Sequence, residues 1–313
     1  MGVLARTVLL AAAVAMVDFF LPRLLPGSPL ASSELAPLPM SAQQELRQRY
    51  GLDRPLAQQF ADYVTGLLRG DLGRSLATHR PVADLLRERL PWTVLLVGVS
   101  WSCGMLLGAS LGTVSAIRPG SWTARIWART SVALAAIPEF VMAMLLVVVF
   151  SVRWPLFPAG GVPWASEVGP GPLHGVTEVL RRLVLPTVAL TVSATSLFTL
   201  ASRNLLVGVL AEPFLLVARA KGLAPRRVLT HAWRCVLPAF LVLAGLRLAT
   251  LVTGAVAVER VFNYPGLGSL LFDAVVRRDY PVIQGVFLVG SWLALAASAG
   301  AEVLGRWADP RLR

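Results

Sequence analysis

The sequence predicts an all-α, polytopic membrane protein with six transmembrane helices and a segment of short helices on the outer face. Three observations support this fold class. Of the 313 residues, 56% are hydrophobic and only 15% are charged, whereas a soluble domain has about a quarter of its residues charged. Apolar runs of about 20 residues, the length needed to cross a bilayer, recur along the chain. Arginines gather in the short loops beside these runs.

Six apolar runs are long enough to be spanning helices. They cover residues 5–25, 92–117, 130–152, 180–202, 236–258 and 283–304. The first run has only Arg6 ahead of its apolar core, as a signal peptide would, but residues 21–26 after it offer no clean cleavage site with small residues. We therefore expect the first run to be an uncleaved span.

These runs divide the chain into three parts. Residues 1–25 form the first transmembrane helix, residues 26–91 an outer segment, and residues 92–313 a five-helix core. The core contains a basic stretch at residues 212–238, called here the basic elbow.

The outer segment carries start and stop signals for short helices. Ser41 and Gln44 form a capping box for the first helix. Pro55 opens a second helix, which Gly70 closes. A third stretch runs from Pro81 to Pro91. We expect these helices to rest on the outer face as a cap over the bundle.

Loop charges predict that both termini lie in the cytoplasm, because short cytoplasmic loops carry an excess of Lys and Arg. With the N-terminus inside, the inner loops and the tail hold Arg118, Arg125, Arg129, Arg203, Arg219, Lys221, Arg226, Arg227, Arg234, Arg306, Arg311 and Arg313. The long outer segment mixes eight arginines with seven acidic residues. Long loops translocate regardless of charge, so this segment does not oppose the assignment.

The sequence carries no motif for chemistry of its own. It has no P-loop for a nucleotide and no HExxH motif or paired cysteines for a metal. Ser100 and Ser193 lie in spans, but no histidine lies in a span to activate them. The net charge of +12 is explained by membrane topology, so we do not expect nucleic-acid binding. We expect no enzymatic activity and no metal site.

The two cysteines, Cys103 and Cys235, fall in or at the start of apolar runs. In the membrane or on the cytoplasmic side a disulfide is not expected. We interpret both as small packed residues.

The basic elbow joins two apolar runs by two short helices. Gly222 stands where a helix ends in left-handed backbone, and Pro225 stands where a second helix can begin. Val228, Ala232 and Val236 form an apolar stripe, with Leu229 and Trp233 beside it, and Arg227, His231 and Arg234 form a polar face. The elbow is either a dock for a soluble partner or a basic loop that fixes topology, and for Trp233 we favour core packing.

Five stretches resemble the B-type inner-membrane permease subunit of the dipeptide/oligopeptide/nickel ABC importers. They are LLPGSP at 24–29, RYGLDRPLAQQFADYVTGLLRGDLGRSL at 49–76, ARAKGLAPRRVLTHAWRCVLP at 218–238, VERVFNYPGLGSLL at 258–271 and RDYPVIQG at 278–285. The resemblance covers the chain in order from end to end. Three features depart from the family pattern: Ala224 where serine is frequent, Cys235 where asparagine is common, and Asp18, an acidic residue within the first span.

This resemblance implies a type I ABC importer permease fold and a function. The chain would move peptides across the cytoplasmic membrane together with a C-type sister permease, two ATP-binding subunits and an extracytoplasmic solute-binding protein. ATP and Mg would be used by the ATPases, with no cofactor on this chain. The elbow, similar to the family's EAA loop, would dock on an ATPase through Glu212, Ala218, Arg219, Lys221, Gly222, Pro225, Arg227, His231 and Pro238.

Two charged residues stand inside predicted spans. Glu139 follows Pro138 about ten residues, or roughly 15 Å, from the inner end of its span, and Arg247 lies at similar depth in another span. Ionisable groups at such depth face a cavity or a partner. We expect both to face the bundle interior, either paired with each other or with Glu139 alone on the transport path.

A turn signal stands in the outer stretch that follows the fifth run. Glu259, Pro265, Gly266 and Gly268 are candidates for an outer gate or a seat for the binding protein, with a simple cap as the alternative.

Other functions fit the sequence less well than a peptide importer does. A nickel or metal-chelate importer would use a similar permease. A secondary transporter would need no elbow and would show inverted repeats of hydropathy, which this sequence lacks. An intramembrane enzyme would need a nucleophile–base pair, and a purely structural membrane anchor is the last alternative.

Overall fold

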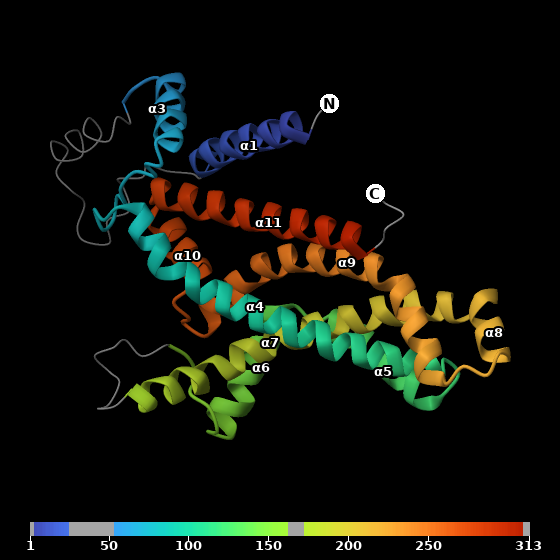
Figure 1. The fold of residues 1–313 in the computed structure, drawn as a ribbon. Coiled ribbons are helices and arrows are strands. Elements are labelled where there is room, and N and C mark those ends of the chain that lie inside the picture. Colours follow the sequence, from blue (N-terminus) through green and yellow to red (C-terminus); the bar gives the residue numbers. More distant parts are fainter. Residues whose placement is uncertain (1–2, 25–52, 162–171, 309–313) are drawn as a thin grey trace. The chain divides into compact units, whose positions relative to one another are not determined.

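The computed structural model describes residues 3–24, 53–161 and 172–308, and most of them are in helices (Figure 1). Within these ranges there is no β-sheet, only an isolated bridge between Arg74 and Pro81. The all-α class predicted from the sequence is confirmed. The chain forms two compact units, Met1–Trp92 with Pro265–Trp292, and Thr93–Tyr264 with Leu293–Arg313.

In the first unit an aromatic cluster joins α1 (Val3–Phe20) and η1 (Leu21–Leu24) to α3 (Leu56–Leu68). The ring of Phe19 lies 5.2 Å from that of Phe60, and the guanidinium of Arg23 lies 3.5 Å from the centre of the Phe19 ring. The guanidinium also donates to Gln59 Oε1 over 2.9 Å. Helix α3 follows Pro55 and ends before Gly70, whose φ is +74°, as the sequence predicts.

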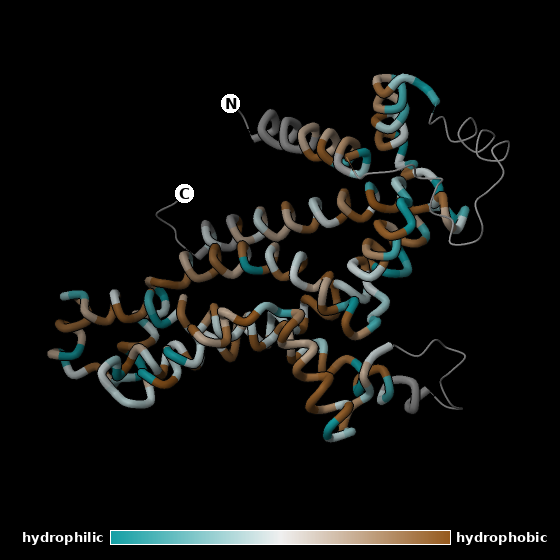
Figure 2. The backbone as a smooth tube through the Cα atoms, turned by 180° about the vertical axis from the view of Figure 1, so that it is seen from behind, coloured by the Kyte–Doolittle hydropathy of each residue, from teal (hydrophilic) through white to brown (hydrophobic). Residues whose placement is uncertain are grey.

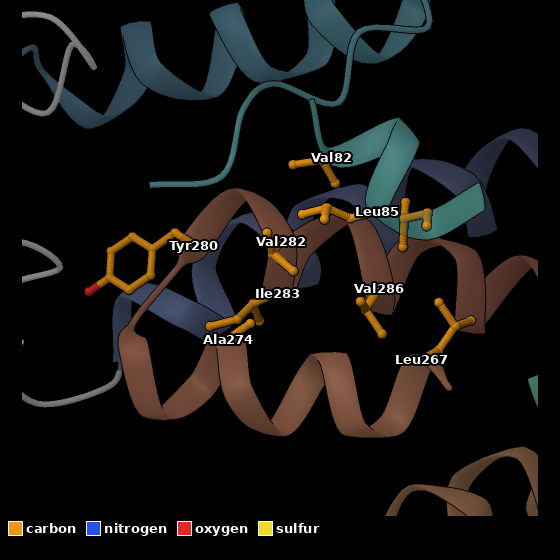
Figure 3. Packing of buried hydrophobic residues seen from close by; sticks show 9 residues of the cluster. Val82, Leu85, Leu267, Ala274, Tyr280, Val282, Ile283 and Val286 are labelled. Carbon is orange, nitrogen blue, oxygen red and sulfur yellow. The ribbon is translucent and has the colours of Figure 1, made fainter. Parts of the chain in front are cut away.

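The core of the first unit lies where α4 (Val82–Ile117), α10 (Leu267–Arg277) and α11 (Tyr280–Ala308) begin. Figure 3 shows the packed side chains, and the buried members are Val82, Leu85, Leu86, Leu267, Ala274, Tyr280, Val282, Ile283 and Val286. Helix α10 ends at Arg278 in left-handed backbone, so the chain turns at once into α11. The turn signal read from the sequence is thus followed by a short helix, and the last span begins at Tyr280.

The second unit is built around α7 (Pro172–Leu210), which packs against α9 (Pro225–Val261), α5 (Trp122–Ala135) and α6 (Glu139–Val147). The long helix α4 approaches α7 so closely that a Cβ atom on Gly108 would collide with Phe198. At the same place Ser202 Oγ donates to the carbonyl of Gly108 over 3.1 Å. Small residues thus let two backbones meet, which is how membrane helices gain contact without a hydrophobic driving force.

Four helices of the described ranges are long and apolar enough to cross a membrane. They are Val82–Ile117, Thr177–Leu210, Pro225–Val261 and Tyr280–Ala301, and they match the predicted runs 92–117, 180–202, 236–258 and 283–304. In Figure 2 the middle parts of these helices are coloured mostly as hydrophobic. Hydrophilic residues gather around α8. Helix α1, at the first predicted run, is not among the four, so the count of six spans stays a prediction.

The third predicted span, residues 130–152, is wrong as a single helix. Helix α5 ends at Ala135, and the chain resumes as α6 and a π-helical turn, η2 (Val148–Arg153), after a bend of 96°. Pro138 lies at the bend, where it lacks an N–H and disfavours helical backbone at the residue before it. The helix is therefore broken at this proline.

Two further expectations differ from the structure. The stretch expected to end at Pro91 continues, because α4 runs unbroken from Val82 through Pro91 to Ile117. Cys103 and Cys235 are exposed on this chain instead of packed, although both are free thiols as expected. The predicted capping box at Ser41 lies outside the described residues.

Candidate functional site: the basic elbow and the charge cluster

The basic elbow consists of α8 (Pro213–Ala220), a turn at Gly222 and the start of α9. The NH of Leu223 donates to the carbonyl of Ala218 over 3.2 Å, and the NH of Gly222 to that of Arg219 over 2.9 Å. These two bonds are a Schellman motif, which requires left-handed backbone at its glycine. Gly222 has φ +78°, so the helix stop predicted here is present.

The second helix of the elbow starts without a side-chain cap. Its N-cap is Ala224, which has no side-chain oxygen to accept from the first amides, and Pro225 is the first helical residue. A serine cap would add about 1 kcal/mol of helix stability. Helix α9 is 37 residues long, so the second helix of the elbow and the fifth predicted span are one helix. Pro238 lies inside it, and Figure 1 shows α9 bending along its course.

The apolar stripe of the elbow packs on the bundle as the sequence predicts. Val228, Ala232 and Val236 are buried in one cluster with Ala116, Leu206 and Leu215. Trp233 packs against this cluster, and its indole NH donates to Thr113 Oγ1 over 3.1 Å. The core role favoured for Trp233 is confirmed, and α4, α7, α8 and α9 are tied together at this end.

The other face of the elbow is open. Arg227, His231 and Arg234 are exposed, as the helical spacing predicts. Glu212, the N-cap of α8, and Arg219 and Lys221 at its end are exposed as well.

Helix α8 exposes apolar side chains that were not predicted to be exposed. Phe214, Leu216 and Val217 have about half of their surface exposed, at 49%, 52% and 52%. Only Leu215 of this run is buried. The signal was available, because four apolar residues in a row cannot all face one side of a helix. An apolar patch next to cationic side chains is suited to a protein partner.

A hollow of about 610 Å³ lies beside the turn of the elbow. It is lined by Ala116, Ile117, Pro119, Val207, Leu210, Ala211, Arg219, Leu223, Pro225, Arg226, Val228 and Leu229. The wall is mostly apolar, and two arginines contribute to it.

The structure brings Glu139 and Arg247 together with Ser193. Arg247 Nη2 lies 3.1 Å from Glu139 Oε1 and donates to Ser193 Oγ over 2.7 Å, and Ser193 Oγ donates to Glu139 Oε1 over 2.9 Å. The direct contact between the two charged residues, one of two arrangements considered, is therefore present. Ser193 joins them from α7, a contact that no sequence pattern predicted.

The candidate residues of the outer gate fall in different units. Glu259, near the end of α9, is fully buried, and Thr93 Oγ1 donates to its Oε1 over 2.7 Å. Gly266 is the N-cap of α10, where Gly268 is buried. Pro265 is half-buried. Close by Glu259 in the chain, burial raises the pKa of the Tyr264 phenol, and the charge of Glu259 adds to this.

An acidic residue that the sequence did not single out organises the first unit. The buried carboxylate of Asp279 accepts from Ser75 Oγ over 2.5 Å and from the NH groups of Leu76 and Ala77 over 3.0 and 3.2 Å. It therefore fixes the turn before α4 to the start of α11. Ser75 and Asp279 are 204 positions apart in the chain, which explains why no local sequence pattern predicted their hydrogen bond.

Known proteins resemble the chain over most of its length. Residues 104–313 match the family described as "Binding-protein-dependent transport system inner membrane component". A protein of Brucella abortus whose name describes a peptide transport system permease is 33% identical over 305 residues, covering 96% of this chain and 94% of the relative. A glutathione transport system permease protein of Escherichia coli is 32% identical over 301 residues, with 96% and 94% covered.

The matched region contains the broken span, the charge cluster and the basic elbow. Together with the all-α fold and its long apolar helices, the match fixes what class of protein this is. Such a subunit is a transport component and not an enzyme. This chain belongs to the family of inner-membrane components of binding-protein-dependent transport systems and is a permease subunit of an ABC importer of the peptide family.

Proposed function

We propose that this chain forms one half of a path that carries peptides into the cell, with a C-type sister permease as the other half. Two ATP-binding subunits would dock below it and a solute-binding protein above it. The cargo class is supported by the relatives, whose names specify peptide and glutathione transport. Glutathione is itself a small peptide. A nickel or metal chelate, the alternative cargo, has no such support among these relatives.

The observation that carries this proposal is the two-sided build of the basic elbow. Its buried stripe of Val228, Ala232 and Val236 is fixed to the bundle, while α8 leaves Phe214, Leu216 and neighbouring cations open. A dock that transmits force needs both a grip on the partner and a stiff connection to the spans. The Schellman turn and the unbroken α9 supply that connection.

ATP and Mg would be bound by the partner subunits, and closure of the ATPase pair would pull the elbows together. The open face of the elbow is cationic and would suit an acidic groove on the ATPase. For that contact the elbow must lie in the cytoplasm, as the arginine-rich inner loops predict, with both termini on the same side.

The test is ATP-driven uptake by the complete transporter, reconstituted in vesicles with its binding protein. Gly222→Val should leave the complex assembled but abolish uptake of a labelled peptide, because a β-branched residue strongly disfavours φ +78°. Gly70→Val is the matched control. Its φ is +74°, and like Gly222 it has open space around it, but it lies in the outer segment.

Normal uptake by Gly222→Val would exclude the elbow as the coupling element. Equal loss of uptake in both variants would mean that backbone strain at either glycine, and not the elbow in particular, causes the loss. If the wild-type complex took up a nickel chelate and no peptide, the peptide cargo would be excluded and the metal chelate would be the cargo.

A further inference from the structure

The cluster of Glu139, Ser193 and Arg247 lies at the break in the third predicted span. Glu139 is the first residue of α6, directly after the 96° bend, and Ser193 and Arg247 reach it from α7 and α9. Broken helices within membranes are a recurrent setting for transport sites, because polar backbone there is tolerated only beside protein or a water-filled cavity.

The cluster is partly open. The side chains of Arg247 and Glu139 retain 16% and 26% of their surface. A charged side chain facing lipid would cost about 2.5–3.5 kcal/mol on insertion scales, so the open part is expected to face a path or a partner. Phe140, the next residue in α6, is 44% exposed, which leaves the neighbourhood of the pair accessible.

The pair also has unused hydrogen-bonding capacity. Arg247 donates through Nη1 to Thr250 and through Nη2 to Glu139 and Ser193. Its Nε is buried and has no hydrogen-bond partner among the described residues. A guanidinium can donate five hydrogen bonds in a planar fork that matches a carboxylate. Arg247 could therefore donate to a cargo carboxylate in place of Glu139.

We propose that Glu139, Ser193 and Arg247 form a charge-exchange site on the transport path, where the ammonium and carboxylate groups of a zwitterionic peptide replace the internal ion pair during passage. The cargo ammonium binds Glu139, and the cargo carboxylate binds Arg247 with Ser193 as a further donor. This inference rests on the proposed peptide import and deepens it by assigning a site and a required cargo charge.

The physical argument for a zwitterion is charge balance. A purely cationic cargo that bound Glu139 would leave Arg247 without its counter-ion in a low-dielectric region. An anionic cargo that bound Arg247 would leave Glu139 without its counter-ion. Leaving one buried charge uncompensated is strongly unfavourable. A zwitterion satisfies both residues at once, so the exchange keeps the net charge of the site constant.

The experiment compares three forms of one labelled peptide: free, N-acetylated and C-amidated. Uptake into vesicles is measured for the wild-type transporter and for Glu139→Gln and Arg247→Gln. We expect Glu139→Gln to reduce the preference for the free over the acetylated peptide about tenfold, and Arg247→Gln to reduce the preference for the free over the amidated peptide by a similar factor. The binding protein is identical throughout, so its own preference cancels between variants.

The control variant is Glu178→Gln, which breaks an ion pair to Arg182 of 2.9 Å within α7, outside the cluster. It should leave both preferences unchanged. Where a blocked peptide is not delivered by the binding protein, crosslinking to a photoreactive side chain at Phe140, with peptide added directly to the purified permease complex, gives the same comparison.

The two proposals fail differently. Absence of ATP-driven uptake of the free peptide by the wild type would contradict the peptide-importer function itself. Normal wild-type uptake, with both variants lowering all three peptides by the same factor, would mean that the cluster only holds the fold together. Unchanged preferences in both variants would likewise overturn the exchange site.

Discussion

At the scale of single residues, buried and half-buried charged groups hold together parts of the chain that are far apart in sequence. Asp279 holds one turn through three hydrogen bonds, Glu139 and Arg247 are paired across two helices, and Glu259 is fully buried near the end of α9. Buried charges are costly unless they are hydrogen-bonded or paired, and here each of these has a partner. Removing one member of such a group should therefore cost more than removing an apolar neighbour.

For Asp279 we predict that Asp279→Ala lowers the stability of the first unit by about 3 kcal/mol or more, since hydrogen bonds to charged groups contribute about 1.5–3 kcal/mol each. Ser75 and two backbone amides would lose their acceptor. Faster proteolysis of the 71–81 turn in the purified transporter is the readout. Asp53→Ala, at an exposed position of the same unit, is the control and should be cleaved at the wild-type rate.

For the ion pair we predict non-additivity. Glu139→Gln and Arg247→Gln should each weaken assembly of the permease in membranes, and the double variant should be less harmful than the sum. A coupling energy of about 0.5–3 kcal/mol is expected for residues in contact. A thermal-stability assay of the assembled complex measures it. Strict additivity would be at odds with the 3.1 Å contact between the two side chains.

At the scale of elements, prolines show what a sequence can and cannot predict. Pro91, Pro186 and Pro238 all lie inside continuous helices, whereas Pro138 stands at a 96° break. The local penalty is the same in each case, a missing donor and a clash with the preceding turn. Tertiary packing around each proline decides whether the helix breaks there, and this packing could not be predicted from the sequence.

Elements governed by local rules were predictable. The turn at Gly222 and the stripe of Val228, Ala232 and Val236 depend on nearest neighbours and helical spacing, and both are present. The contact of Asp279 with Ser75 and the part of Ser193 in the charge cluster depend on residues far apart in the chain. Likewise the exposure of Cys103 depends on which face of α4 meets α7.

The segment between α9 and α10 gives a prediction of its own. Asn263 is exposed and has φ +46°, and beside it the carbonyl of Phe262 accepts from the NH of Gly161 over 2.7 Å. A cysteine placed at Asn263 should crosslink to the solute-binding protein if this segment helps to seat it. Absence of a crosslink in every nucleotide state would instead favour a simple cap over the bundle.

At the scale of the whole molecule, orientation in the membrane decides whether the proposed assembly is possible. The family match and the apolar helices show a multi-pass membrane protein, and the direction of insertion rests on the arginine-rich loops. In the proposed assembly the elbow, with its exposed cations, would face the ATPases, and the segment with Asn263 would lie on the opposite side of the membrane.

The orientation is tested with reporters fused after Arg313. A reporter that works only in the cytoplasm should be active there, and one that works only outside should be silent. The same pair fused after Arg69, in the outer segment, should give the opposite result. The reverse pattern at Arg313 would place the C-terminus outside and separate the elbow from its proposed partner.

Helix α9 has one more consequence for how such a transporter can be altered. Its 37 residues correspond to about 55 Å of helix at 1.5 Å per residue, and this one unbroken helix carries the elbow stripe, Arg247 and Glu259. The angles at which these three features point away from the helix axis are therefore linked to one another. Inserting one residue between the stripe and Arg247 would turn the rest of the rod by about 100°, whereas inserting seven would return it to within about 20° of its original setting.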